Sequence, residues 1–381
     1  MQNFDFSNPV RIVFGRGVIP ELGPAAAKAG RKALLVYGGG SIKKNGVYEA
    51  LTRALRENGV AFAEHSGVKP NPVLSHVRAG VAKARAEGCD MIIAAGGGSV
   101  IDESKAIAAG AKYGGDVWDF FCGKAEVESA LPLFTALTIP ATGSEMNSGC
   151  VVTNEETRQK YSAGGPALFP RVSALDPEAT MTLPREQSAY GAVDAIAHII
   201  ENYFTTSDAD NAVTDELVHA VARSVIASTR RIMKDPKDYN ARASMMWSAT
   251  LALNGLANCG YGGGGFINHA IEHSLSAFYD IPHGAGLAIV IPAWAGKYLE
   301  RGGRARLENF GRGVFGEATA EGTIKAMEAF FREVGAPVRL GELKIPAADI
   351  PKVAANAAAT VKLWGMEMQQ PEIEEILRAA L

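Results

Sequence analysis

Two short stretches of the chain concentrate residue types that bind metal ions. In the apolar run GAVDAIAHII, Asp194 and His198 stand four residues apart, which places them one turn apart on one face of a helix. A carboxylate in apolar surroundings is costly unless a partner or a metal ion compensates its charge. The pair therefore predicts either a buried hydrogen-bonded couple or two ligands of one metal ion.

A second group of histidines follows in the stretch FINHAIEHSLSAFYDIPHG, which contains His269, His273 and His283. Because the chain has only seven histidines, three of them in one short stretch favour a shared role over caps of separate helices and turns. An aspartate with imidazoles suits a divalent first-row metal, with Fe²⁺ and Zn²⁺ as the leading candidates. Spacing alone leaves open whether His269 or His273 joins His283 as a ligand.

The composition is that of a soluble globular enzyme. Hydrophobic residues make up 47% of the chain and charged residues 21%, a balance that argues against long disorder. The net charge of −3, with signs mixed along the chain, excludes a nucleic-acid or anionic-membrane surface. Four dispersed cysteines without a CxxC pair, no signal peptide and no membrane span predict a cytoplasmic protein.

Strands alternate with helices up to about residue 176, and helices dominate afterwards. Such alternation predicts a largely parallel sheet that binds ligands beyond the carboxyl ends of its strands. We expect strands over 11–14, 32–37, 61–65, 91–95 and 133–139, and helices over 47–57, 73–87 and 99–112. Later helices are expected over 185–203, 209–233, 238–257, 266–277 and 286–300, with three or four more. The sequence thus predicts an α/β domain over 1–180 and an all-helical domain over 181–381.

Glycine runs follow two of the expected strands. GGGS occupies 38–41 and again 96–99, where it opens a helix. Glycine lets the backbone approach a ligand closely, and a helix amino terminus attracts phosphate, so the second run predicts a pyrophosphate site. Neither GxGxxG nor the lysine pattern of ATP-binding loops is present, which favours a dinucleotide over ATP. The bend at 140–145 and the polar loop at 153–165 offer further contacts or ordinary turns.

Four segments give the chain a resemblance to the iron-containing, group III alcohol dehydrogenase family. They are ALDPEATMTLPREQSAYGAVDAIAHIIE, HAIEHSLSAFYDIPHG, GGGSVIDESK and PATGSE, and the likeness extends over essentially the whole chain. Within the family the chain is most similar to the butanol dehydrogenase branch of broad aldehyde reductases. The resemblance implies a dehydroquinate synthase-like fold, with a dinucleotide-binding domain, a helical metal-binding domain, an active site in the cleft between them and a homodimer.

The resemblance also implies roles for single residues. His273 would lie near nicotinamide and substrate as a proton-relay group rather than a ligand. The metal ligands would be Asp194, His198, His269 and His283, of which the first two also count as catalytic. The pyrophosphate would lie on Gly96, Gly97, Gly98 and Ser99. Further cofactor contacts would come from Gly38, Gly39, Ser41, Asp102, Thr138, Thr142 and Lys160, and from Asn147 near the substrate pocket.

The cofactor preference follows from a departure from some NAD-specific relatives, which place an acidic residue after the second strand. This chain has glycines and Ser41 there, so a 2′-phosphate meets no like charge, and we expect NADP(H) over NAD(H), with Lys43 or Lys44 assisting. The expected reaction interconverts primary alcohols such as butanol and their aldehydes by hydride transfer, with the metal as Lewis acid. Alternatives are a glycerol or diol dehydrogenase, a dehydroquinate synthase-like lyase, and a binding protein without hydride transfer.

Overall fold

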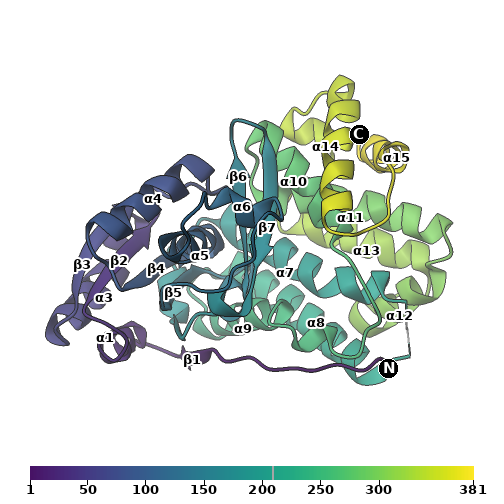
Figure 1. Ribbon diagram of the computed structural model, residues 1–381. Helices are drawn as coiled ribbons and strands as arrows, with labels where there is room; N and C mark the ends of the chain where they lie inside the picture. Colours follow the sequence, from purple (N-terminus) through teal and green to yellow (C-terminus); the bar gives the residue numbers. More distant parts are fainter. Residues whose placement is uncertain (208–209) are drawn as a thin grey trace. The chain divides into compact units, whose positions relative to one another are not determined.

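The computed structural model describes residues 1–207 and 210–381, which fall into two compact units. The first, here called the α/β unit, contains Ser7–Leu183 and Pro236–Met246. The second, the helical unit, contains Met1–Phe6, Pro184–Asp235 and Trp247–Leu381. Figure 1 labels the helices and strands of both units.

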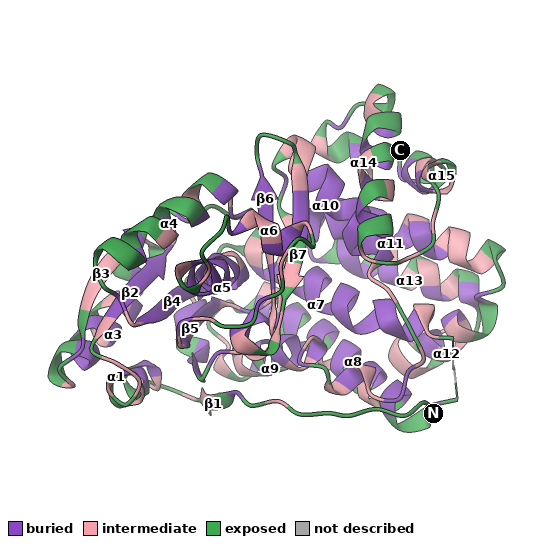
Figure 2. Ribbon diagram, in the orientation of Figure 1, coloured by how far each residue is buried: buried purple, intermediate pink, exposed green. Residues whose placement is uncertain are grey.

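The α/β unit is built on a six-stranded sheet whose order is β1-β8-β5-β4-β2-β3 (Figure 1). All neighbouring strands in it are parallel. The apolar runs of β4 and β5 place these strands in the middle of the sheet, where nearly every residue is buried (Figure 2). The strands are β1 (Arg11–Phe14), β2 (Lys32–Tyr37), β3 (Ala61–Ser66), β4 (Met91–Gly97), β5 (Leu133–Ile139) and β8 (Val172–Leu175).

Hydrophobic cores lie on both faces of this sheet. Successive residues point to opposite faces of a strand, so Leu34 and Ile92 join one core while Leu35 and Ile93 join the other. Burial on both faces is typical of parallel sheets and explains the unbroken apolar runs. The helices of this unit are α1 (Leu22–Ala27), α2 (Ser41–Lys44), α3 (Val47–Glu57), α4 (Leu74–Ala86), α5 (Gly98–Lys112) and α6 (Trp118–Phe121).

An antiparallel hairpin, β6 (Gly149–Asn154) with β7 (Gln159–Gly164), follows the fifth strand of the sheet. The prediction of a polar loop over 153–165 is therefore wrong for most of that stretch. Val152 pairs with Tyr161, and both are buried. Tyr161 also stacks on Trp118 at a centroid distance of 5.7 Å, a tertiary contact that the local polarity of TNEETRQK conceals. Strand β8 is also absent from the expected elements, because Ser173 and Ala174 leave VSAL with few of the β-branched and aromatic residues that indicate a strand.

The helical unit contains no strand within its described residues. Helix α7 (Arg185–Thr205) is its most buried long helix and contacts α8, α10 and α11 (Figure 2). A helix expected from residue 209 begins at Ala212, and residue 209 itself lies outside the described residues. The other helices are α8 (Ala212–Lys234), α10 (Ile267–Tyr279), α11 (His283–Glu300), α12 (Arg304–Val314), α13 (Ala320–Glu333), α14 (Ile350–Leu363) and α15 (Gln370–Ala379), while α9 (Tyr239–Ala252) is divided between the units.

Short 3₁₀ helices occur in both units. They are η1 (Ile19–Glu21), η2 (Ser144–Met146), η3 (Pro166–Leu168), η4 (Pro177–Thr180), η5 (Leu256–Asn258), η6 (Leu340–Leu343) and η7 (Ala347–Asp349). None of the helices in the described ranges has the length and apolarity that a membrane span requires.

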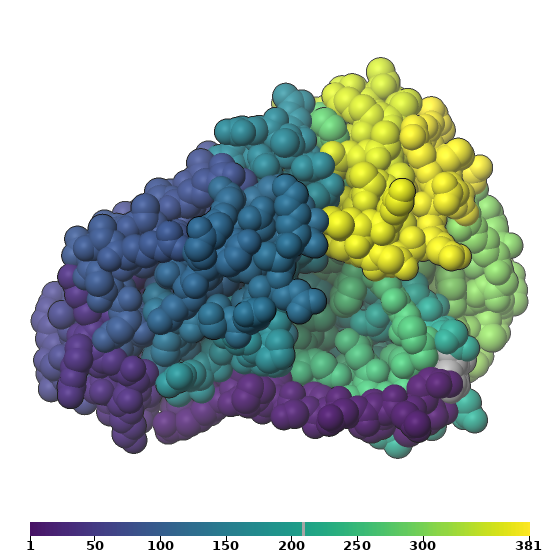
Figure 3. Space-filling view, viewed as in Figure 1, coloured from purple at the N-terminus to yellow at the C-terminus, as the bar shows by residue number. Residues whose placement is uncertain are grey.

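The surface of the helical unit includes both ends of the chain. Helices α14 and α15 pack together and are seen in yellow in Figure 3. The first six residues form no helix or strand and are exposed (purple in Figure 3). They are nonetheless attached, because the Met1 ammonium donates to the Asp210 carbonyl at 3.1 Å and the Gln2 amide donates to the Gly260 carbonyl at 2.9 Å.

Candidate functional site

Helix α7 carries the first pair of candidate ligands. The helix begins after Pro184, and every residue from Gly191 to Phe204 is buried. Asp194 and His198 lie one turn apart in this segment, as their spacing predicts, with side-chain exposures of 4% and 6%. A carboxylate so deeply buried needs a cation beside it.

A tight turn between α10 and α11 brings the later histidines back to α7. Asp280 ends α10 in the left-handed region at φ 49°, and Pro282 in extended conformation leads directly into His283, the first residue of α11. The next residue, Gly284, packs on the backbone of α7, where a Cβ atom would stand 2.2 Å from the Tyr190 carbonyl oxygen. Only glycine allows α11 to approach α7 this closely.

Three imidazoles converge on one oxygen of Asp194. Its Oδ1 atom lies 3.6 Å from Nε2 of His198, 3.6 Å from Nε2 of His269 and 3.4 Å from Nε2 of His283. Among the described residues, this Oδ1 atom and Nε2 of His269 are buried without any hydrogen-bond partner. A bound cation would interact with these buried atoms, which otherwise lack hydrogen bonds. The four side chains therefore fit a divalent metal ion.

Two buried glutamates orient these imidazoles from behind. Glu201 contacts Nδ1 of His269 through one oxygen and accepts the Asn268 amide with the other. Glu272 contacts Nδ1 of His283, and neither glutamate has any exposed surface. Carboxylates in this position fix which ring nitrogen is protonated and leave the other free for a metal. Sequence reasoning missed both glutamates, although Glu201 lies two turns after Asp194 on the same apolar face.

The electrostatics of the cluster favour a positive occupant. Burial raises the pKa of Asp194, but the facing imidazoles of His198, His283 and His269 hold that pKa well below its usual value. Burial lowers the pKa of His269, whereas Glu201 and Asp194 together raise it to about 9. The site therefore stabilises a cation, whether that cation is a proton or a metal ion.

His273 lies beside this cluster on α10, one turn after His269. It is 3% exposed, and its ring centroid lies 5.5 Å from that of His283 and 5.3 Å from that of Trp364. One of its ring nitrogens lies within 4.8 Å of ligand-type atoms of Glu272 and His283. Asp194, His198 and His269 form a separate group whose ligand-type atoms also lie within 4.8 Å of one another.

The second glycine run joins β4 to α5 in the α/β unit. Cβ atoms on Gly96, Gly97 and Gly98 would come within 2.8 Å of Val100, Ile139 and Thr142 respectively. The turn is therefore too crowded for side chains, and Thr142 lies against it. Thr138 lies buried near the end of the neighbouring strand β5. Helix α5 has no side-chain cap at its amino terminus, so its first N–H groups can bind phosphate.

The first glycine run, Gly38–Ser41, leads from β2 into α2. Gly40 has φ 96°, a conformation that favours glycine. A Cβ atom on Gly39 would meet nothing within 4 Å, so the loop has open space beside it. Lys43 lies 3.6 Å from the Glu64 carboxylate and is thus already paired, which leaves Lys44 as the other basic residue of α2.

Two more of the predicted contacts, Asp102 and Asn147, belong to a buried polar network around Lys105, a residue that sequence reasoning missed. The Lys105 ammonium donates to Ser144, Gly149 and both oxygens of Asn147 at 2.8–2.9 Å. Asp102 accepts from the Ser144 hydroxyl at 2.6 Å and from the Val151 amide at 2.9 Å. These bonds fasten η2 and β6 to α5, so Asp102 and Asn147 both shape the loop after β5.

Lys160 on β7 lies apart from that network. It is buried and donates to the Asn71 side chain at 3.1 Å. Ser99, at the start of α5, donates to the Pro70 carbonyl. Both residues therefore contact the segment that precedes α4.

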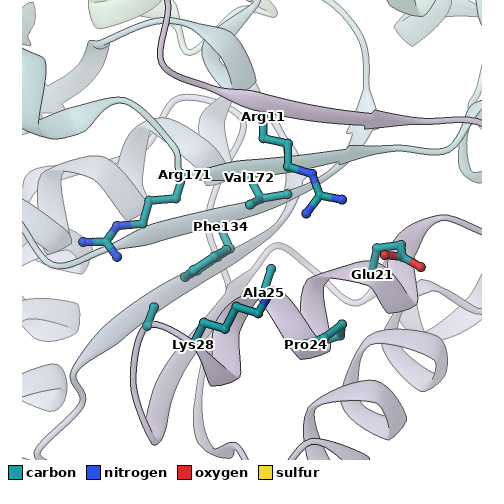
Figure 4. A pocket seen from close by; sticks show the side chains of 9 residues that line it. Arg11, Glu21, Pro24, Ala25, Lys28, Phe134, Arg171 and Val172 are labelled. Carbon is teal, nitrogen blue, oxygen red and sulfur yellow. The ribbon is translucent and has the colours of Figure 1, made fainter.

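A surface pocket of about 350 Å³ lies elsewhere in the α/β unit (Figure 4). Arg11, Phe134 and Val172 line it from the amino-terminal ends of β1, β5 and β8, and Glu21 and Lys28 flank it from the ends of α1. The glycine turns follow the opposite, carboxyl ends of their strands. Because ligands of parallel sheets bind at the carboxyl ends, this pocket is not the expected cofactor site.

Comparisons with known proteins agree over both units. The family model described as iron-containing alcohol dehydrogenase matches residues 9–177, and the model for the C-terminal part of the Fe-containing alcohol dehydrogenase family matches residues 188–381. The probable NADH-dependent butanol dehydrogenase 2 of Bacillus subtilis is 40% identical over 394 residues, with 100% of each chain covered.

Two further matches come from an enzyme and from a solved structure. The NADPH-dependent aldehyde reductase of Escherichia coli is 35% identical, with 92% of each chain covered. The crystal structure of NADH-dependent butanol dehydrogenase A from Thermotoga maritima matches with a TM-score of 0.97 at 46% identity, covering 100% of this chain and 99% of that one.

Proposed function

The chain belongs to the iron-containing alcohol dehydrogenase family, and from this premise we propose how its own residues serve the reaction. The expected family, its butanol dehydrogenase branch and the fold class are confirmed. The chain is an NAD(P)-dependent oxidoreductase that interconverts alcohols and aldehydes with a nicotinamide cofactor and a metal ion. Which residues hold the metal and the cofactor is the proposal.

The proposed metal ligands are Asp194, His198, His269 and His283. The observation that carries this proposal is the convergence of three Nε2 atoms on one buried oxygen of Asp194, at 3.4–3.6 Å. When bound there, Fe²⁺ or Zn²⁺ supplies a Lewis acid that polarises a carbonyl oxygen. Glu201 holds the His269 ring with its Nε2 atom toward Asp194.

His273 is proposed to transfer the proton of the reaction. It is buried beside the proposed ligand His283, and its ring stands roughly perpendicular to that of Trp364. A histidine changes its charge near neutral pH, so this residue can pass a proton toward the alcohol oxygen in reduction and take it up in oxidation.

The α/β unit is proposed to bind the dinucleotide, with the division between domains at residues 180–181. The pyrophosphate is placed on Gly96, Gly97, Gly98 and Ser99 because the turn admits no side chain and α5 lacks a cap. NADP(H) is proposed over NAD(H) because the turn Gly38–Ser41 carries no carboxylate to repel a 2′-phosphate. One relative is named NADH-dependent and another NADPH-dependent, so the preference is tested by comparing the two cofactors.

Asp102, Thr138, Thr142, Asn147 and Lys160 are proposed to complete the cofactor site. Positions of three of these residues support the proposal. Thr142 lies against the glycine turn, and Asp102 and Asn147 both take part in the hydrogen bonds around η2. A homodimer in a reducing, cytoplasmic compartment is proposed as well, since β1 is an edge strand and the four cysteines are free.

The test is the loss of reduced-nicotinamide absorbance with butyraldehyde, using protein stripped by a chelator and reloaded with Fe²⁺ or Zn²⁺. We expect cofactor oxidation only after reloading, and faster with NADPH than with NADH. Activity of the stripped protein equal to that of the reloaded protein would contradict the metal centre. A much higher kcat/KM for 1,3-propanediol or glycerol than for butanol would instead identify a diol dehydrogenase.

A further inference from the structure

A second cluster of metal-binding side chains lies in the α/β unit, whereas the centre on α7 belongs to the helical unit. It consists of His65 on the edge strand β3, His76 on α4 and Glu103 on α5. One oxygen of Glu103, Oε1, lies 3.2 Å from Nε2 of His65 and 2.6 Å from Nδ1 of His76. None of the three residues has a part in the proposed metal centre or nucleotide site.

Glu103 is the most deeply buried member of this cluster. It has no exposed surface, and its second oxygen, Oε2, is buried without a hydrogen-bond partner among the described residues. His65 is only 7% exposed. A buried carboxylate with one unsatisfied oxygen is strongly unfavourable unless positive charge lies next to it. The two imidazoles are the neighbours that can hold such a charge.

The hydrogen bonds of His76 reveal where the charge must sit. Its Nε2 atom lies 3.2 Å from the Ser66 carbonyl oxygen, which can only accept, so Nε2 carries a hydrogen. In a neutral ring the Nδ1 atom would then present a lone pair to Glu103 Oε1 at 2.6 Å. Two lone pairs at this distance repel each other. A proton shared by the two atoms removes this repulsion at 2.6 Å, and a metal ion removes it once the two atoms move apart.

The arrangement repeats that of the first centre. There, the rings of His198 and His269 stack at 4.7 Å and 24° beside one oxygen of Asp194. Here, the rings of His65 and His76 stack at 4.1 Å and 28° beside one oxygen of Glu103. At the first centre Glu201 contacts Nδ1 of His269, and here the Ser66 carbonyl oxygen accepts from Nε2 of His76. An acceptor at the ring nitrogen that does not bind the metal is the usual support of a metal-ligating imidazole.

We propose that His65 Nε2, His76 Nδ1 and the Glu103 carboxylate bind a divalent transition-metal ion of the Zn²⁺ type. Ligand atoms about 2.0–2.1 Å from a tetrahedral zinc ion lie roughly 3.3 Å apart. The 3.2 Å contact to His65 already fits this spacing, and the 2.6 Å contact to His76 must widen by about 0.7 Å. The side chain of His76 is 27% exposed, which provides an entry path and room for a water as fourth ligand. The ion ties the edge strand to α4 and α5.

The test counts metal ions in the full chain after loading with Zn²⁺ and gel filtration. Wild type should carry two equivalents and His76→Gln one, while His76→Gln keeps its alcohol dehydrogenase activity. Arg78→Gln, an exposed change on the same helix, should keep both equivalents. An Asp194→Asn variant should retain the second ion, and Asp194→Asn combined with His76→Gln should retain none. Loading with Co²⁺ should give a tetrahedral absorption band in Asp194→Asn that His76→Gln removes.

Two results would overturn the proposal. Wild type could bind a single equivalent that Asp194→Asn abolishes, in which case a proton alone bridges Glu103 and His76. Alternatively, the double variant Asp194→Asn, His76→Gln could bind zinc as tightly as Asp194→Asn alone, within about two-fold. Loss of a true ligand should weaken zinc binding at least ~10-fold. Neither result depends on the reaction proposed above, because the readout is metal stoichiometry.

Discussion

Replacing Gly284 with alanine tests how the metal centre depends on the approach of α11 to α7. The added Cβ atom would stand 2.2 Å from the Tyr190 carbonyl oxygen and 2.8 Å from the Tyr190 Cα atom. Since contacts of this kind need more than 3 Å, the helices must separate by about 1 Å. The obstacle is backbone, so no side-chain rotation can relieve it. Overpacking of this kind costs about 1–3 kcal/mol.

The same helix supplies a matched control in Gly296, where a Cβ atom would meet nothing within 4 Å. Gly296→Ala should stabilise the protein by about 0.5–1 kcal/mol through helix propensity. The two variants should therefore differ by about 1.5–4 kcal/mol in the free energy of unfolding measured with urea.

Gly284→Ala should also weaken Zn²⁺ binding, measured by competition with a chelator, because its neighbour His283 moves away from Asp194. A Gly284→Ala variant as stable as Gly296→Ala, with unchanged zinc affinity, would refute the packing argument and the placement of His283.

Three further changes address the centre and the cofactor. Glu201→Gln should weaken zinc binding about 10–100-fold, since one amide cannot accept from both Asn268 and His269; affinity equal to wild type by chelator competition would contradict this. His273→Ala should reduce kcat by about 10²–10⁴ with full metal content, and loss of the metal would show that His273 is a ligand. Gly39→Asp should lower kcat/KM for NADPH relative to NADH by at least about ten-fold through like-charge repulsion, whereas Gly39→Ala should leave the ratio unchanged.

The strands and helices that could be predicted from sequence are those with runs of β-branched and apolar residues or with a long helical period. The expected ranges 11–14, 32–37 and 133–139 coincide with β1, β2 and β5, and 47–57 coincides with α3. Strand β8 and the hairpin β6–β7 could not be found in this way. The first contains Ser173 and Ala174 and so has few strand-favouring residues, and the second is held by contacts such as the stacking of Tyr161 on Trp118.

The sequence by itself determined that Asp194 and His198 lie on one helix face, because helical geometry relates residues four apart whatever surrounds them. It also determined the family through its motifs. Only the tertiary structure decided that Nε2 of His283 and Nε2 of His269 reach the same oxygen of Asp194, and that Glu201 stands behind one ring.

The second cluster illustrates the same division. His65, His76 and Glu103 are spread over a strand and two helices, and no spacing along the chain relates them. Parallel pairing of β3 with β2 and the packing of α4 on α5 bring their side chains together. Contacts between residues distant in sequence depend on how whole elements pack, and local periodicity carries no record of that packing.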